Sequence, residues 1–172
     1  SAWSALCYQR GLLVCHASVV QVGDEGVAFC GPVGAGKSSL AAWLTGRGYP
    51  LISDDLCRLD VPTSGPPCLY PSAPRLKLWR EAIDALGWNS AELERDHFRL
   101  DKFHLPWTGD RPSQPLPLRA IYLLEWGEVG LARLTGVTAV CRLMAAATYR
   151  GDLLEPMGLV AAHWQRCVDL AR

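Results

Sequence analysis

The sequence predicts an α/β fold, with one mixed β-sheet and helices that lie mostly after residue 36. The first observation is an apolar segment at 27–30 that leads into a glycine-rich loop, followed by a helical segment at 39–44. The second is a strand at 11–22, which a tight turn joins to segment 27–30 as an antiparallel hairpin. The third is a strong later strand at 118–126. The hairpin predicts a mixed sheet, because purely parallel sheets separate their strands with helices.

Length and charge limit the class of protein. A chain of 172 residues, 49% of them hydrophobic, predicts a single domain over residues 1–172 with a sizeable core. The formal net charge of zero gives no electrostatic reason to expect nucleic acid or an anionic membrane as a partner. No apolar run approaches the roughly 20 residues of a membrane span. We therefore expect neither nucleic acid nor membrane as a partner.

The seven cysteines predict a reduced protein. Their number is odd and no two of them form a CxxC pair, so we expect neither a zinc site nor a disulfide framework. Most are expected to be small apolar core residues. A cytoplasmic setting fits this usage best.

The glycine-rich loop is a complete GxxxxGK[ST] phosphate-binding motif, GPVGAGKS at residues 31–38. Glycines let backbone N–H groups converge on nucleotide phosphates without Cβ clashes. The lysine supplies a charge near the β- and γ-phosphates, the serine hydroxyl can ligate Mg²⁺, and the helix N-terminus adds partial positive charge. The motif therefore predicts that ATP and Mg²⁺ bind at Gly31, Gly34, Ala35, Gly36, Lys37, Ser38 and Ser39.

Two carboxylates and a histidine are further candidates for the site around the glycine-rich loop. Residues 51–53 predict a strand that ends in Asp54 and Asp55. Acidic residues at such a strand end, beside a phosphate-binding loop, ligate Mg²⁺ and activate hydroxyls in phosphoryl transfer. Because consecutive residues of an extended chain point to opposite sides, the two need not share a role. His16 lies inside the expected first strand, where histidine is more often structural, but the hairpin places that strand beside the loop.

The middle of the chain predicts shorter elements. Residues 62–74 carry five prolines and predict a stiff surface loop. Residues 75–79 alternate like a strand, with Arg75, Lys77 and Trp79 on one face, and 80–86 predict a short helix. Ser90 is a candidate N-cap for another short helix. Lys102 lies in a mixed segment at 98–107, where contact with a phosphate and a plain surface position are equally expected.

The last third predicts a strand pair and a helical end. A second proline-rich loop spans 106–117, and 129–134 are the expected partner of strand 118–126. Residues 138–149 predict a helix, and a capping-box-like start at Asp152 predicts a second one running to the C-terminus.

In the order and spacing of these elements, the chain resembles the catalytic domain of the HPr kinase/phosphorylase family. The resemblance is carried by His16 with Ala17-Ser18-Val19, by GPVGAGKSS at 31–39 and by Ser53-Asp54-Asp55. It covers residues 10–60 with good specificity, and LRAIYLLE at 118–125 looks like a later core strand of the same family.

The resemblance implies a nucleotide-binding fold closer to phosphoenolpyruvate carboxykinase than to ordinary P-loop enzymes. It implies phosphate transfer to a serine hydroxyl, with Asp54 as general base, Asp55 and Ser38 holding Mg²⁺ or its water, and His16 lining the γ-phosphate site. The two aspartate roles can be exchanged. Lys37 and a further cation, from 75–77 or Lys102, would neutralise charge. Family members form rings, so a homo-oligomer is one partner to consider.

The ExRGxG signature of the bifunctional enzymes does not follow the aspartates, and the stretch YPSAPRLKLW is similar to short tailoring kinases of peptide natural products, including lasso peptides. We therefore expect a Mg²⁺-dependent ATP kinase acting on a serine-type hydroxyl of a peptide or protein. Its alternatives are an HPr kinase/phosphorylase that regulates sugar transport, a small-molecule kinase, and a non-catalytic nucleotide-binding module.

Overall fold

The computed structural model describes residues 2–73, 75–96, 99–110 and 112–172. The strands are β1 (Leu13–Cys15), β2 (Ala17–Val22), β3 (Glu25–Cys30), β4 (Leu51–Ser53), β5 (Cys57–Asp60), β6 (Cys68–Tyr70), β7 (Arg75–Trp79), β8 (Glu94–Asp96), β9 (Arg99–Pro106) and β10 (Leu116–Leu123). The α-helices are α1 (Ala2–Gln9), α2 (Lys37–Thr45), α3 (Arg80–Ala85), α4 (Gly136–Arg142) and α5 (Val160–Leu170). Shorter helical turns are η1 (Ser90–Glu92), η2 (Leu143–Ala147) and η3 (Gly151–Leu153).

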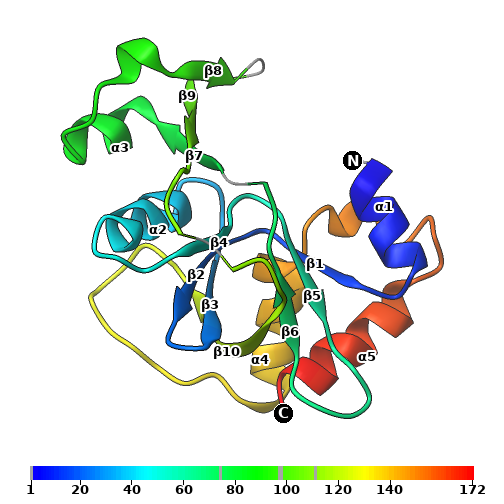
Figure 1. Ribbon diagram of the computed structural model, residues 1–172. Helices are drawn as coiled ribbons and strands as arrows, with labels where there is room; N and C mark the ends of the chain where they lie inside the picture. The colour runs from blue at the N-terminus through cyan, green and yellow to red at the C-terminus, as the bar shows by residue number, and fades with distance from the viewer. Residues whose placement is uncertain (1, 74, 97–98, 111) are drawn as a thin grey trace.

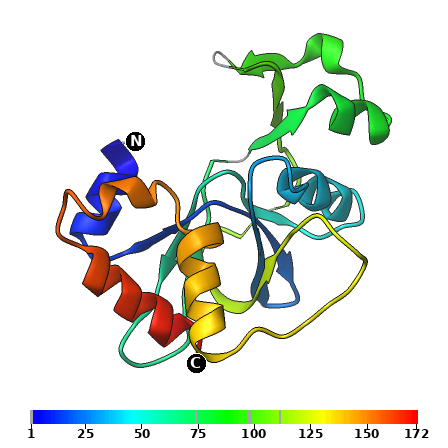
Figure 2. The same cartoon turned by 180° about the vertical axis from the view of Figure 1, so that it is seen from behind.

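Two sheets organise the fold, and the larger one is mixed, as predicted. Its strand order is β1-β5-β6-β10-β3-β2-β4, with β10 parallel to β3 and the other neighbours antiparallel. The smaller sheet, β7-β9-β8, together with α3 makes a lobe that projects from one end of the larger sheet (Figures 1 and 2). The fold is therefore of the α/β class, and its larger sheet contains both parallel and antiparallel strand pairs.

Helices cover both faces of the larger sheet. On one face, seen in front in Figure 2, α4, η2 and α5 bury Val140, Leu143 and Cys167 against the strands. On the other face, α2 buries Ala41 and Ala42 in a cluster that also holds apolar residues of the lobe. The core therefore ties α2 to both the hairpin and the lobe. Among the described helices, none combines the length and the apolar character needed to cross a bilayer.

The region around the glycine-rich loop forms as predicted. Strands β2 and β3 pair as an antiparallel hairpin from Ala17↔Cys30 to Val22↔Glu25, and α2 follows the loop. The predicted strand at 75–79 is β7, with Leu76 and Leu78 buried on one face. All seven cysteines are free, and five are buried, so the core interpretation is confirmed for Cys7, Cys15, Cys30, Cys57 and Cys167.

The prediction of one continuous strand over 11–22 is wrong at His16. The chain changes partners there, because β1 pairs with β5 whereas β2 pairs with β3 and β4. The His16 backbone N–H donates instead to the Ala147 carbonyl at 2.8 Å, and Cys15 bridges to Thr148. His16 therefore stands at a break between two strands.

Two predictions in the middle of the chain are also corrected. Residues 62–74 were predicted as loop, but β6 forms within them because Leu69 pairs with Leu59 and Leu116 on its two sides. Pro74, the last proline of that segment, lies outside the described residues. Ser90 is not the N-cap of η1, because the Asn89 side chain accepts the hydrogen bond from the Ala91 N–H at 3.0 Å. Phe98, at the start of the mixed segment, also lies outside the described residues.

The last third departs most from the prediction. Residues 129–134 form no strand, because β10 already has β3 and β6 on its two edges, and Val129 is fully exposed. The helix expected over 138–149 is α4 followed by the five-residue π-helical turn η2. The final helix begins at Val160 and not at Asp152, because Gly158 has a positive φ of 66° and ends the preceding turns.

Candidate active site

A small cavity lies where the glycine-rich loop meets the lobe. Figure 1 shows the loop between β3 and α2 directly beneath β7. The start of β2, the loop, the end of β4 and the lobe all contribute to its walls, because the hairpin and the α2 core cluster hold these segments together. The lining residues are His16, Ser18, Val33, Gly34, Gly36, Lys37, Ser38, Ser39, Asp55, Lys77, Leu78, Trp79 and Lys102.

The loop has the backbone conformation that its glycines allow. Gly34 and Gly36 have φ values of 87° and 88°, which residues with a Cβ rarely adopt. A Cβ at Gly31 would lie 2.5 Å from the carbonyl oxygen of Leu124, so the backbone just after β10 leaves room only for glycine. The Lys37 ammonium lies in the loop's own concavity and donates to the Gly31 and Pro32 carbonyls, both at 2.9 Å. Burial lowers its pKa.

Asp54 lies inward at the end of β4 and is only 8% exposed. Its Oδ1 accepts hydrogen bonds from the hydroxyls of Ser18 at 2.5 Å and Ser38 at 2.8 Å. Its Oδ2 accepts from the backbone N–H of Lys77 at 2.7 Å. Burial raises the pKa of Asp54 more than these three hydrogen bonds lower it. Asp54 therefore joins β2, α2 and β7 through one buried carboxyl group.

Asp55 faces the cavity. Its carboxylate accepts a hydrogen bond from the Lys77 ammonium at 2.9 Å and lies 3.6 Å from His16 Nε2. Burial alone would raise its pKa, but the hydrogen bond and the charge of Lys77 lower it below the usual range, with a further contribution from His16. Asp55 also has a φ of 71°, a left-handed conformation that is uncommon for a residue other than glycine.

Lys77 links this site to the lobe. Besides Asp55, its ammonium lies 3.8 Å from the carboxylate of Asp96 in β8. His104 Nε2 lies 3.5 Å from the same carboxylate. A chain of opposite charges therefore runs from the end of β4 across β7 to β8.

The structure gathers most of the predicted site residues in one place. His16, Gly34, Gly36, Lys37, Ser38, Ser39, Asp55 and Lys102 all line the loop cavity. The Lys102 ammonium lies 5.7 Å from the centroid of the Trp79 ring, which also lines the cavity. Gly31 and Ala35 belong to the loop but not to the lining, and Asp54 lies behind it.

Ser18 is one of the residues to which the sequence analysis assigned no role. It is fully buried in β2 and makes the shortest of the hydrogen bonds to Asp54. A polar residue within the apolar segment ASVV was the available signal, because a buried hydroxyl needs a partner.

The donors present at the cavity fit Mg²⁺. Within the described parts of the chain, no group of three or more His, Cys, Asp or Glu residues is arranged to hold a metal ion. Mg²⁺, however, keeps several waters and is bound by one or two carboxylates together with substrate phosphates. The Ser38 hydroxyl lines the cavity and donates to the buried Asp54 carboxyl group at 2.8 Å, so a hard oxygen donor is held in place beside the loop.

A larger groove adjoins the loop cavity. It has a volume of about 640 Å³, and its walls come from α1, β5, the end of β6 and the start of β7. Asp55 and Lys77 line both spaces, and Asp54 lines the groove alone. The carboxylate of Asp55 therefore lies at the junction of the two.

No protein-family model matches the chain, and no curated protein is significantly similar to it.

Proposed function

We propose that this chain is a Mg²⁺-dependent kinase that transfers the terminal phosphoryl group of ATP to a serine-type hydroxyl on a peptide or protein. The fold would then be a phosphate-binding-loop domain of the HPr kinase/phosphorylase type. The loop 31–38 supports the nucleotide half of the proposal, since its left-handed glycines and buried lysine suit phosphate oxygens.

One observation carries the proposal. Asp55 lines both the loop cavity and the larger groove, which is where a group that receives a proton from an acceptor hydroxyl must lie. A nucleotide phosphate in the loop cavity and a hydroxyl entering from the groove would meet beside this carboxylate. A module that only binds nucleotide has no need of a carboxylate at that junction.

The surroundings of the two aspartates favour the exchange of their roles, with Asp55 and not Asp54 as the general base. Asp55 lines both the loop cavity and the groove, so its carboxylate can reach an acceptor hydroxyl and suits the general base. Asp54 has both oxygens engaged, and its bond to the Ser38 hydroxyl suits the Mg²⁺ side of the site. We therefore propose Asp55 as the base and Ser38, positioned by the carboxyl group of Asp54, as the residue that would hold Mg²⁺.

The proposed step transfers one phosphoryl group. The acceptor hydroxyl oxygen forms a bond to the γ-phosphorus, the bond from that phosphorus to the β–γ bridging oxygen breaks, and ADP leaves. The hydroxyl proton passes to the Asp55 carboxylate. Lys37 and Lys102 lie on the cavity walls, where cations stabilise negative charge on the transferred group. When bound, Mg²⁺ would neutralise charge on the β- and γ-phosphates.

The test is phosphate transfer from γ-labelled ATP with Mg²⁺ to a panel of serine-containing peptides, HPr protein and serine metabolites, followed by mass spectrometry. The wild-type protein should add one phosphate to a peptide or protein. Lys37→Met keeps the volume of the buried side chain but removes its charge, and should lower the rate by about 10² or more. Arg47→Met, which removes an exposed cation from the end of the same helix region, should leave it unchanged.

Each contrary result has a defined meaning. Phosphorylation of a metabolite with no peptide modified would favour the small-molecule kinase. ATP binding without modification of any acceptor, together with no Lys37-dependent ATP hydrolysis, would favour the nucleotide-binding module. Unchanged transfer by folded Lys37→Met would contradict the role of the loop.

A further inference from the structure

The groove beside Asp55 has a cationic wall. Arg10 directly follows α1, Arg58 lies in β5 and Arg75 in β7, so three separate segments bring arginines to one space. None of the three has a carboxylate partner among the described residues. Like charges that converge without a counter-charge favour an anionic ligand.

The acidic residues of the groove do not balance this wall. Among the residues that the structure describes, its lining holds two carboxylates, Asp54 and Asp55, and Asp55 also lines the loop cavity. Both are already engaged by serine hydroxyls or by Lys77. The other described lining residues are cationic or apolar, apart from the neutral hydroxyls of Tyr70 and Ser72.

Arg58 provides a second and independent observation. Its Nε is buried, and within the described chain no atom accepts a hydrogen bond from it. Its guanidinium carbon lies 3.8 Å from the centroid of the Tyr70 ring, which holds the group in place at the groove. A buried N–H without an acceptor costs free energy, and a ligand carboxylate is the acceptor that a guanidinium binds best.

The α1 side of the groove suits a peptide chain better than a free ion. Trp3 and Leu6 of α1 line the groove and are 42% and 43% exposed. Large apolar side chains at the edge of a cationic groove favour a ligand that carries both acidic and apolar groups. The groove volume of about 640 Å³ exceeds what a single carboxylate needs and suits several residues of a peptide.

We propose that this groove binds an acidic segment of the peptide substrate and directs its serine hydroxyl to Asp55. This inference rests on the proposed kinase function, and it adds the class of acceptor: a peptide in which glutamate or aspartate residues flank the serine. The acidic side chains contact Arg10, Arg58 and Arg75, and apolar neighbours contact α1.

Binding is measured first, so that the outcome does not depend on catalysis. A fluorescein-labelled peptide with one serine between glutamates is titrated with the full chain, and anisotropy is recorded. The same peptide with glutamine or lysine in place of glutamate, and an oligothymidylate of similar charge, are the comparison probes. We expect the glutamate peptide to bind about tenfold more tightly than the glutamine peptide, and addition of salt to weaken it.

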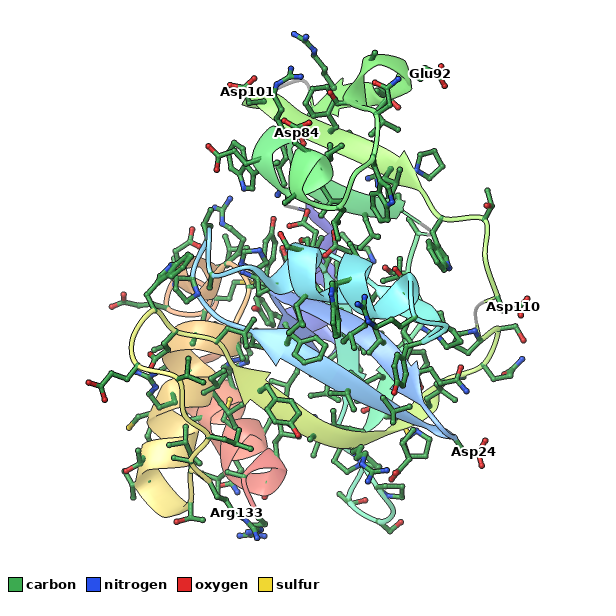
Figure 3. All side chains as sticks on the ribbon, turned by 90° about the vertical axis from the view of Figure 1, so that its left-hand side faces the viewer. Asp24, Asp84, Glu92, Asp101, Asp110 and Arg133 are labelled. Atoms are coloured by element: carbon green, nitrogen blue, oxygen red, sulfur yellow. The ribbon has the colours of Figure 1, made fainter. Side chains whose placement is uncertain are left out.

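Variants assign the binding to the groove. Arg75→Glu and Arg10→Glu should each weaken the glutamate peptide about tenfold or more, without weakening the glutamine peptide. Arg133→Glu makes the same charge change on an exposed residue at the end of the molecule opposite the lobe, as Figure 3 shows, and should have no such effect. Melting curves identify any variant that does not fold, and Arg58→Lys then tests the buried guanidinium with the charge retained.

Several results would overturn the inference. These are equal binding of the glutamate and glutamine peptides, no binding of the glutamate peptide up to about 1 mM, tighter binding of the oligothymidylate, and equal weakening by Arg133→Glu. A groove filled by a second copy of the chain would appear as a dimer that Arg75→Glu dissociates, and would also overturn it.

Phosphate transfer to the same peptides separates the two proposals. If all serine peptides are phosphorylated regardless of charge, the kinase function holds and the acidic-groove inference fails. If the glutamate peptide binds as expected but is never phosphorylated under conditions where ATP binds, the kinase function fails while the groove remains a peptide site.

Discussion

Asp54 and Asp55 are adjacent in the sequence but lie in opposite surroundings. Asp54 is buried, with its two oxygens engaged by two hydroxyls and one backbone N–H. Asp55 borders two open spaces and is held by the charge of Lys77 and the ring of His16. The pKa of Asp54 is raised and that of Asp55 is lowered.

The difference separates a positioning role from a chemical one. A carboxyl group whose oxygens are all engaged fixes the elements that donate to it, here β2, α2 and β7. A carboxylate that faces a cavity remains accessible to a ligand. Substitutions at the two positions should therefore affect different measurements, and the following predictions test that.

The largest expected effect is on the rate. Asp55→Asn removes the proposed base and should lower kcat by about 10²–10⁴, with little change in the Mg²⁺ concentration needed. Asp54→Asn should instead raise the Mg²⁺ concentration needed for half-maximal rate. Initial rates measured against ATP and Mg²⁺ test both, with Asp24→Asn, in the exposed hairpin turn, as control. A greater loss of kcat in folded Asp54→Asn would restore the first assignment of roles.

Stability should depend on the partners of Asp54. Ser18→Ala removes a fully buried hydroxyl that donates to this carboxyl group and should lower the free energy of unfolding by about 2 kcal/mol. Ser38→Ala removes a part-buried partner and should lower it less, because water can replace the hydroxyl. Urea unfolding measures both, and Ser64→Ala on an exposed loop should be neutral. Equal effects of Ser18→Ala and Ser64→Ala would contradict the buried network.

The two aspartates should change the pH dependence of stability in opposite directions. Burial raises the native pKa of Asp54, so this group lowers stability as the pH rises above the ordinary carboxyl range near about 4. Burial alone would raise the pKa of Asp55, but Lys77 lowers it, so this group adds stability as the pH rises toward about 4.

The variants make this sign measurable. Relative to wild type, the unfolding free energy of Asp54→Asn should increase as the pH rises above about 4, while that of Asp55→Asn should decrease as the pH rises toward about 4. Urea unfolding without divalent ions at each pH gives both curves. Slopes of the same sign would show that the two carboxyl groups do not differ in this way.

The smallest expected effect concerns the backbone of Asp55. Its φ of 71° is strained for a residue with a Cβ, so Asp55→Gly should be more stable than Asp55→Ala by about 1 kcal/mol. Both variants lack the carboxylate, so the difference reports the backbone alone. Thermal unfolding measures it, and equal melting temperatures would exclude such strain.

Local patterns predicted the elements around the site. The hairpin, the loop, α2, β4 and β7 each depend on residues close in sequence: alternating apolar positions, a glycine turn and a helical run. Elements set by distant contacts were not predicted. β6 exists because β5 and β10 pair with it, and residues 129–134 are not a strand because β10 has no free edge.

The candidate site also has a part that local sequence patterns predicted and a part that depends on distant contacts. The motif placed Lys37 and Ser38 in one loop, and the strand pattern placed Asp54 and Asp55 at one strand end. Neither pattern assigned the partners of those residues. Ser18, Lys77 and Asp96 come from β2, β7 and β8, which the chain brings together only when the lobe docks over α2.

The sequence by itself therefore determined the loop, its lysine and the adjacent carboxylates, because glycine conformation and short-range periodicity decide these without distant contacts. The tertiary structure alone decided which carboxyl group is buried and which faces the cavity, and it formed the arginine-lined groove. The N-terminal helix α1 reaches that groove because the Tyr8 hydroxyl donates to the Tyr149 carbonyl, far along the chain. The physical reason is that burial, hydrogen-bond partners and pKa values all depend on neighbours that distant segments supply.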